Sequence, residues 1–233
     1  MNDSAPESRS SQQFFDNLSP RYTRMIRRVV PRYEEMLWAL LYYLPEDFAP
    51  KRILELGCGT GNLSALLIRK YPQAELTLVD ISREQLNACR ERFPGNDRLH
   101  FLQSDFRELP TRAGHYDLVV SSIAIHHLPD PDKAELFKHI YQQLKHGGLC
   151  AYSDQFGGST PDLYAKHMQR WEEWARQQEV PQEEWDTWME HQRESDFHAP
   201  LPEQMRWLQE AGFTSIDSPW RYLLWTVIQA RKG

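Results

Sequence analysis

Three glycines, Gly57, Gly59 and Gly61, stand at alternate positions in the segment ILELGCGTGN, directly after an apolar run. Glycine is needed where the torsion φ is positive or where a ligand must approach the main chain, and a strand-to-helix turn presents unpaired N–H groups. The spacing alone is a weak signal, because a tight turn uses the same residue type. If it binds a ligand, it does so with backbone rather than with side chains.

Side chains at the ends of the next two apolar runs add chemistry to this loop. Asp80 and Ile81 follow the segment ELTLV, and a carboxylate at this place can accept hydrogen bonds from both hydroxyls of a ribose. A helix N-cap is the other interpretation of Asp80, since DIS also resembles a helix start. In QSDF, Asp105 can meet an adenine amino group and Phe106 can cover the face of the base. Together these signals predict an adenosyl ligand.

The loop also distinguishes between adenosyl ligands. A dinucleotide fingerprint has the spacing GxGxxG, in which the third glycine allows close packing of helix on strand. Here the order is G-C-G-T-G-N, and Glu55 precedes it by two residues. Because Glu55 can face a cationic group, the pattern favours a sulfonium amino acid over a pyrophosphate.

The elements that must position these residues alternate along the chain. We predict strands at 52–57, 75–80, 99–105, 116–123 and 148–156, and helices at 62–70, 83–93 and 132–144. Such alternation implies right-handed crossovers and a mostly parallel sheet with helices on both faces. The motifs then lie at the carboxyl ends of the strands. A helix that ends at Gly212, a strand at 214–218 and an apolar run at 222–230 complete the chain.

Two helical segments lie outside the alternation. We predict a disordered tail at residues 1–13 and one domain at 14–233, whose part 14–48 forms a helical cap with Pro31 between two helices. The insert 159–198 is helical in period, acidic and rich in tryptophan. Both segments are predicted to form a lid.

The composition excludes several classes of protein. A chain of 233 residues with a formal net charge of −6 is one α/β domain without the charge needed to wrap a nucleic acid. Its three cysteines, Cys58, Cys89 and Cys150, form neither a metal-binding spacing nor an even disulfide framework, which is typical of a reducing compartment. The sequence shows no signal peptide and no membrane span. We therefore predict a cytoplasmic protein without a metal site.

Five segments carry a family resemblance: LELGCGTGN, LVDIS, LQSDF, YDLVVSSIAIHHL and LKHGGLCAYSD. In this order they resemble the class I S-adenosylmethionine-dependent methyltransferases over about residues 50–155. The resemblance implies a Rossmann-like, seven-stranded sheet of order 3-2-1-4-5-7-6 with an antiparallel last strand, and S-adenosylmethionine as the cofactor. It implies these contacts: Gly57, Gly59 and Gly61 to methionine, Asp80 to ribose, Asp105 and Phe106 to adenine, and Ser121 after the fourth strand.

The ends of the chain resemble one branch of this family more closely. FFDNLSPRYTRMIRRVVPRYEEM, LCAYSDQF and WLQEAGF are similar to the carboxy-S-adenosylmethionine synthases, which serve wobble-uridine modification of tRNA. In that branch the N-terminal helices close over the cofactor, and an arginine of the late helix meets its extra carboxylate. Here Trp207 stands at that position and Arg206 precedes it. The architecture, including a homodimer by analogy, is therefore carried over, and the activity is not.

Methyl transfer from a sulfonium is an in-line displacement, so the protein chiefly aligns the groups and excludes water. A general base is needed only when the acceptor loses a proton. His126 and His127 in IAIHHLPD lie near the expected methyl position and titrate close to neutral pH. Histidines bonded to backbone at a helix start are the alternative. Of the two, His127 is the better candidate for contact with substrate.

Three aromatic residues are candidates for the substrate wall. Tyr22 lies on the N-terminal segment, and Trp171 and Trp174 share a helix face in the insert. Trp171 and Trp174 either pack the insert onto the domain or form an aromatic wall around the acceptor, with cation–π contact if the acceptor is an amine.

The sequence thus predicts an enzyme that transfers a methyl group from S-adenosylmethionine to a small molecule. Two alternatives stay open at this point. One is synthesis or use of a carboxylated S-adenosylmethionine in tRNA modification. The other is a protein that binds S-adenosylmethionine without catalysis.

Overall fold

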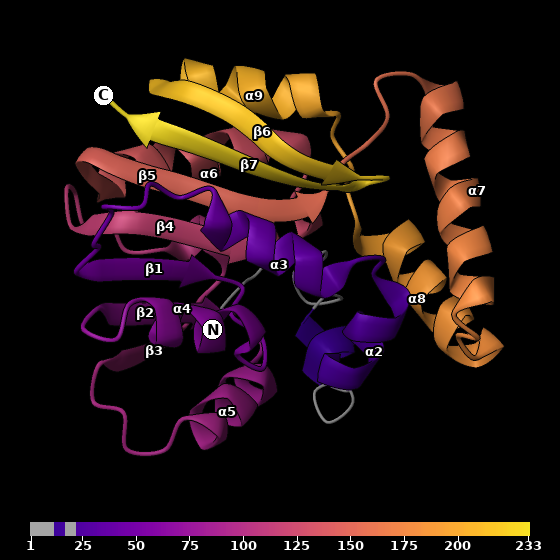
Figure 1. The fold of residues 1–233 in the computed structure, drawn as a ribbon, viewed down its shortest axis with the longest axis horizontal. Coiled ribbons are helices and arrows are strands. Elements are labelled where there is room, and N and C mark those ends of the chain that lie inside the picture. Colours follow the sequence, from indigo (N-terminus) through magenta and orange to yellow (C-terminus); the bar gives the residue numbers. More distant parts are fainter. Residues whose placement is uncertain (1–11, 17–21) are drawn as a thin grey trace.

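The computed structural model describes residues 12–16 and 22–233 of the chain (Figure 1). Most of the predicted tail, residues 1–11, lies outside the described residues. Residues 12 and 13, predicted as its end, belong instead to a helical turn over residues 12–16. The two predicted cap helices are present on either side of Pro31, as α2 (Tyr22–Val29) and α3 (Tyr33–Tyr42).

A seven-stranded sheet forms the centre of the molecule. Its strands are β1 (Arg52–Leu56), β2 (Glu75–Asp80), β3 (Leu99–Gln103), β4 (Tyr116–Ser122), β5 (Leu144–Gln155), β6 (Phe213–Tyr222) and β7 (Trp225–Lys232). The order is β3-β2-β1-β4-β5-β7-β6, and β7 runs antiparallel to both of its neighbours. The fold class and strand order predicted from the sequence are confirmed.

The end of the chain differs in detail from the prediction. β6 continues to Tyr222, four residues beyond the predicted strand, and a turn at Leu223 and Leu224 leads into β7. Leu223 has a positive φ of 54°. The turn residue Leu224 is fully buried, so the turn is as apolar as the strands on either side of it. The apolar pattern of the sequence therefore does not show where one strand ends and the next begins.

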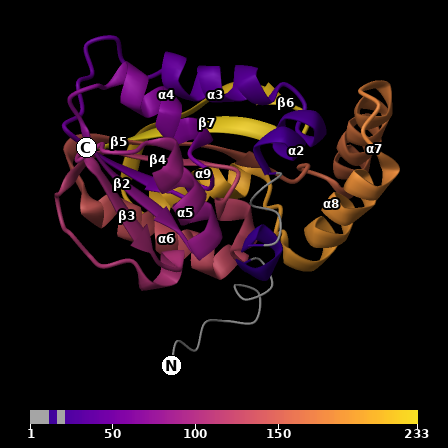
Figure 2. The same ribbon diagram turned by 90° about the horizontal axis from the view of Figure 1, so that it is seen from below.

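Helices cover both faces of the sheet. Figure 2 shows α3 and α4 (Asn62–Lys70) on one side and α6 (Asp130–Gln143) on the other. The helices α5 (Arg83–Arg92) and α9 (Leu201–Glu210) pack on β2 and β6 respectively. Successive strand residues face opposite sides. In β1, Ile53 joins the core under α3 and α4, whereas Leu54 and Leu56 join the core under α6 and α9.

The insert forms two helices, α7 (Pro161–Gln177) and α8 (Gln182–Ser195), at one end of the molecule beside α2 (Figure 1). Trp171 is fully buried and its indole N–H donates a hydrogen bond of 2.6 Å to the Val29 carbonyl oxygen. Its ring meets the edges of Trp185 and Trp225. The insert is therefore anchored to the N-terminal helices and to β7. No helix in the described ranges has the length and apolar character of a membrane span.

We expect Trp171→Ala to lower the free energy of unfolding by about 3–5 kcal/mol, because a large buried ring and its hydrogen bond are removed together. Trp38→Ala is the matched control, since Trp38 is 51% exposed. Urea unfolding followed by far-ultraviolet circular dichroism measures both. Equal losses in the two variants would show that Trp171 does not anchor the insert.

Candidate functional site

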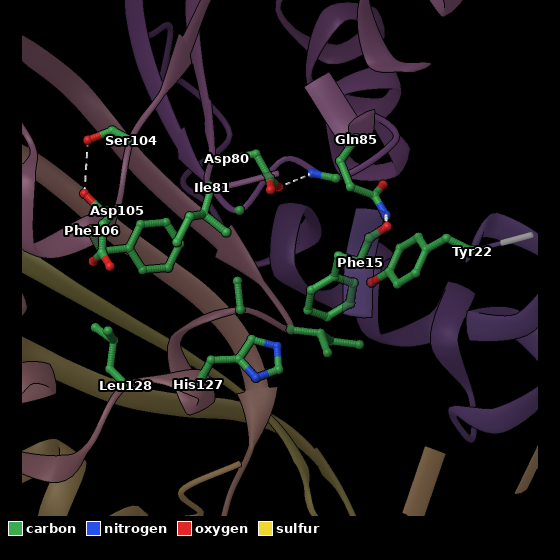
Figure 3. Close-up of a pocket in the computed structure, with 14 residues that line it drawn as sticks. Phe15, Tyr22, Asp80, Ile81, Gln85, Ser104, Asp105, Phe106, His127 and Leu128 are labelled. Carbon is green, nitrogen blue, oxygen red and sulfur yellow. Dashed lines mark hydrogen bonds between the residues drawn. The ribbon is translucent and has the colours of Figure 1, made fainter. Parts of the chain in front are cut away.

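A pocket opens at the carboxyl ends of β1 to β4 (Figure 3). Its empty volume, counted out to the mouth and including open solvent, is 620 Å³. Its wall comes from the loops after these strands and from the N-terminal segment: Phe15, Tyr22, Gly57, Gly59, Asp80, Ile81, Gln85, Ser104, Asp105, Phe106, Ile123, Ala124, His127 and Leu128. Parallel pairing brings these loops to one edge of the sheet.

The glycine loop lies against this pocket, but its three glycines have different surroundings. Gly57 has φ of +68°, and a Cβ there would lie 2.3 Å from the Cβ of Ala124. Gly59 lines the pocket with φ of +52°, and a Cβ there would make ordinary contacts, 3.7 Å from Gln85 and from Tyr22. A Cβ on Gly61 would instead strike Phe93 and Cys89, and Gly61 does not line the pocket. Gly61 thus allows close packing of α5, and its predicted cofactor contact has no support from this geometry.

Asp80 ends β2 with its carboxylate turned toward the glycine loop. Oδ2 accepts a hydrogen bond of 2.8 Å from the Gly59 N–H, and Oδ1 accepts one of 2.9 Å from the Ser82 N–H. Ser82, not Asp80, caps α5. Burial raises the pKa of Asp80 to about 6, although these two backbone hydrogen bonds oppose the shift. Each oxygen of this buried carboxylate has a further lone pair, so Asp80 is suited to accept hydrogen bonds from hydroxyl groups of a ligand.

Asp105 and Phe106 form the opposite wall. Asp105 caps a short 3₁₀ turn, Phe106–Glu108, by accepting the Arg107 N–H. The Arg107 guanidinium also pairs with both oxygens of Asp105, at 3.0 and 2.8 Å. This ion pair fixes the carboxylate at the rim, and the ring of Phe106 faces the pocket (Figure 3). The adenine contacts of both residues stay predictions.

Two further predicted cofactor residues lie behind the pocket. Glu55 is 1% exposed, accepts a hydrogen bond of 2.7 Å from the Ser64 hydroxyl, and borders a small adjoining void with Tyr22 and Tyr33. Burial raises its pKa well above the usual value. The Ser121 hydroxyl donates to the Leu56 carbonyl oxygen and does not line the pocket. Ser121 joins β4 to β1, whereas Glu55 can reach a ligand only through the void.

The two histidines of the loop after β4 have different surroundings. His127 lines the pocket, and its buried Nε2 has no hydrogen-bond partner among residues 12–16 and 22–233. His126 is 2% exposed, lies outside the pocket wall and is held by Asp154 through Nδ1 and the backbone N–H. The structure thus places His127, and not His126, where substrate contact was predicted.

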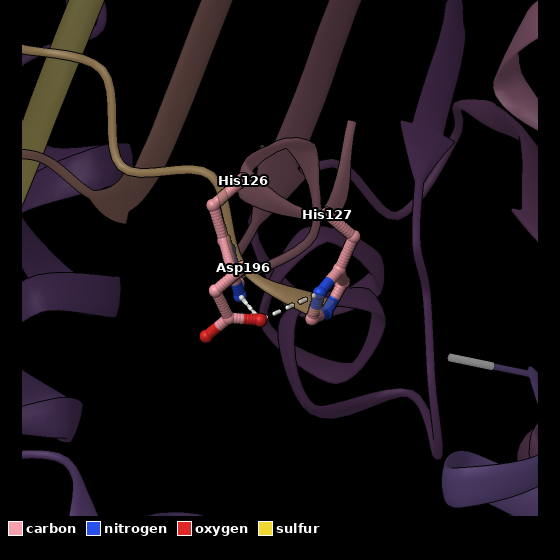
Figure 4. A group of neighbouring side chains, drawn as sticks. All are labelled: His126, His127 and Asp196. Atoms are coloured by element: carbon pink, nitrogen blue, oxygen red, sulfur yellow. Dashed lines mark ion pairs between the residues drawn. The ribbon is translucent and has the colours of Figure 1, made fainter. Parts of the chain in front are cut away.

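A carboxylate of the insert that the sequence did not single out stands between these histidines (Figure 4). Asp196 Oδ1 lies 3.0 Å from His127 Nδ1 and 3.5 Å from His126 Nε2. Burial favours a lowered pKa for His127, but Asp196 outweighs burial and raises it. Burial lowers the pKa of His126. The sequence does not indicate that Asp196 lies beside the two histidines, because about 70 residues separate them along the chain.

Of the predicted aromatic residues, too, some line the pocket and others do not. Tyr22 lines the pocket together with Phe15, which the sequence analysis did not identify. Trp171 is in the hydrophobic core, and Trp174 packs against that core; neither lines the pocket. Of the two interpretations of these tryptophans, the geometry therefore favours packing of the insert onto the domain over an aromatic wall around the acceptor. Arg206 is also remote, since it lies on the exposed face of α9 and pairs with Glu203 and Glu210.

Comparison with known proteins agrees with this fold and pocket. The family described as "methyltransferase domain" matches residues 53–148. The carboxy-S-adenosyl-L-methionine synthase of Trichodesmium erythraeum is 26% identical over 84% of this chain and 79% of its own. A malonyl-[acyl-carrier protein] O-methyltransferase of Methylovorus is 39% identical over 52% of this chain. This chain spans 42% of that relative, and less than half of several others of the same name.

Solved structures show the same architecture. An S-adenosylmethionine-dependent methyltransferase from Mesorhizobium loti superposes with a TM-score of 0.60, at 20% identity, over 84% of this chain and 97% of its own. The fold is the Rossmann-like fold of the class I S-adenosylmethionine-dependent methyltransferases, and residues 53–148 match the methyltransferase-domain family.

We expect the affinity for S-adenosylmethionine to fall about tenfold between pH 7 and pH 5, because a carboxyl with a pKa of about 6 becomes protonated and loses its capacity to accept both hydroxyls. In Asp80→Asn the affinity should be lower at pH 7 and nearly independent of pH over this range. Isothermal titration calorimetry measures both proteins. An equal pH dependence in the variant would show that another group titrates.

Proposed function

We propose that the protein transfers the methyl group of S-adenosylmethionine to a small-molecule acceptor within this pocket. The observation that carries the proposal is that one cavity is lined both by Asp80 and Phe106 and by His127 and Tyr22. The first pair suits the adenosyl part of the cofactor. The second pair supplies a polar end for an acceptor.

The arrangement supports an in-line transfer. With the ribose at Asp80 and the amino acid part along Gly57 and Gly59, the sulfonium would lie between the glycine loop and His127. Phe15, Ile123 and Leu128 give this end an apolar lining, which favours exclusion of water from the reacting groups. We propose that the N-terminal helices and the insert 159–198 act as a lid, because Phe15 and Tyr22 contribute to the wall.

His127 is the proposed contact for the acceptor. Its ring faces the cavity (Figure 3), and its Nε2 is buried there without a described partner. An acceptor hydroxyl or amine can complete this hydrogen bond as it binds. His126 acts indirectly in this proposal, by holding the loop through Asp154.

The carboxylated-cofactor alternative has a specific observation in its favour, the relative that covers 84% of this chain. The position of Arg206 opposes it. Arg206 is exposed and pairs with Glu203 and Glu210 on the outer face of α9. We therefore prefer transfer of a methyl group. A non-catalytic binding protein is the remaining alternative, and detection of turnover would exclude it.

We further propose a cytoplasmic homodimer acting without a nucleic acid partner. Three buried, free cysteines suit a reducing compartment. The outer face of α3 exposes three large aromatic side chains, Trp38, Tyr42 and Tyr43, which contact one another. Exposed aromatic clusters of this kind favour association. Light scattering in solution distinguishes a dimer from a monomer.

Formation of S-adenosylhomocysteine tests the main proposal. Small carboxylates and amines are offered as acceptors, because relatives include enzymes named for malonyl and trans-aconitate substrates. With an accepted substrate, His127→Ala should lower kcat by about 100-fold or more. His139→Ala, a half-buried histidine on α6 outside the pocket, should retain full turnover. Unchanged turnover in His127→Ala would remove the proposed role of His127.

Arg206→Ala should leave the relative affinity for S-adenosylmethionine and its carboxylated form unchanged, because its guanidinium points away from the pocket. Competition binding with the two ligands measures this ratio. A selective loss of affinity for the carboxylated form would promote the alternative function.

A further inference from the structure

Four histidines and one carboxylate gather where the insert meets the loop after β4. Asp196 stands at the centre and is 2% exposed in its side chain. Its Oδ1 lies 3.0 Å from His127 Nδ1, 3.5 Å from His126 Nε2 and 3.8 Å from His191 Nε2. Its Oδ2 lies 3.6 Å from His198 Nε2. Four imidazole nitrogens therefore converge on one buried carboxylate.

One long hydrogen-bond contact, of 3.4 Å between His127 Nδ1 and the Ser195 carbonyl oxygen, does not account for this convergence. Within the described part of the chain, Asp196 Oδ1, His191 Nε2 and His198 Nε2 are buried and have no hydrogen-bond partner. The contact between Asp196 Oδ1 and His127 is close enough for a hydrogen bond but not directed as one. A buried polar atom without a partner costs about 1–3 kcal/mol. Several such atoms in one cluster point to a missing common partner.

The outer contacts of the histidines fix their nitrogen atoms toward that partner. Asp154 holds His126 through Nδ1 at 2.5 Å, so the lone pair of Nε2 faces Asp196. The Tyr164 hydroxyl pairs with His198 Nδ1 at 2.9 Å and leaves Nε2 of that ring inward as well. A carboxylate or hydroxyl behind a histidine is the usual support of a metal-binding imidazole.

We propose that His126 Nε2, His127 Nδ1 and Asp196 Oδ1 bind a divalent transition metal ion, with His191 as a fourth ligand. The candidate atoms of the first three residues all lie within 4.8 Å of one another. Ligands held at about 2.0–2.2 Å from one ion stand about 3–4 Å apart, which agrees with the distances of 3.0 and 3.5 Å to Asp196 Oδ1. His191 Nε2 needs only a small movement to join them.

The donor set indicates which ions fit. Imidazole nitrogens suit Zn²⁺, Fe²⁺, Co²⁺ and Ni²⁺, whereas Mg²⁺ and Ca²⁺ prefer sets made of oxygen alone. The ligands come from two distant parts of the chain, His126 and His127 after β4 and His191 and Asp196 in the insert. A bound ion therefore clamps the insert onto the sheet. It also fixes the ring of His127 with Nε2 toward the pocket.

Cobalt binding to the full chain tests this site without any assay of turnover. Protein treated with a chelator is titrated with Co²⁺, and visible absorption and melting temperature are followed. We expect about one equivalent of Co²⁺, visible bands of nitrogen and oxygen coordination, and a higher melting temperature. Asp196→Asn and His191→Ala should each weaken binding at least about tenfold. Asp154→Asn should weaken it about 10- to 100-fold, through His126.

His139→Ala serves as the control and should bind Co²⁺ like the parent. Because a variant in the cluster can fail to fold, X-ray absorption of the zinc-loaded parent provides the second measurement. The expected shell contains at least two imidazoles and no sulfur. Absence of binding to the parent, a sulfur-containing shell, or undiminished binding in folded Asp196→Asn and His191→Ala would overturn the proposal. None of these results decides whether the protein binds S-adenosylmethionine or transfers its methyl group, because those properties are measured in separate experiments.

Discussion

The parallel pairing of β1 with both β2 and β4 is the constraint on which the site depends. This pairing sets the ends of three strands side by side and forces the loops that follow them into contact. The chain can pass there only because Gly57 has no side chain; a Cβ would occupy the position of Ala124. The same crowding directs the Gly59 N–H onto Asp80. The conformation of the glycine loop, the orientation of the Asp80 carboxylate and the position of the pocket thus all follow from this strand pairing.

Buried charge is the second organising feature, and it is distributed unevenly over the pocket. Beside the glycine loop, burial raises the pKa of Glu55 and Asp80, and the hydrogen bonds to these carboxyl groups oppose the shift only in part. At the far end, histidines hold the pKa of Asp154 and Asp196 below the usual range despite burial. The first end is suited to a cationic sulfonium ligand. The second is built to keep carboxylates ionised.

The two segments outside the alternating pattern meet at the pocket, the N-terminal one in its wall and the insert behind it. The N-terminal segment supplies Phe15 and Tyr22. The insert supplies Asp196 and is anchored through Trp171 to the helix α2. Phe15 also lies beside His127 and His191, so the N-terminal turn touches the histidine cluster as well as the pocket. The N-terminal turn, the histidine cluster and the pocket are therefore in direct contact with one another.

The sequence by itself determined the mostly parallel sheet and the loops that follow its strands, because local patterns carry that information, whereas the strand order came from the resemblance to a family. The period of hydrophobic residues selects strand or helix, and a glycine at positive φ marks a turn wherever it occurs. Asp80 and Asp105 were found in this way. The tertiary structure alone decided three matters: that Trp171 belongs to the core, that Ser121 joins two strands, and that Asp196 stands between His126 and His127. These depend on contacts between residues far apart in the chain, for which one sequence contains no local signal.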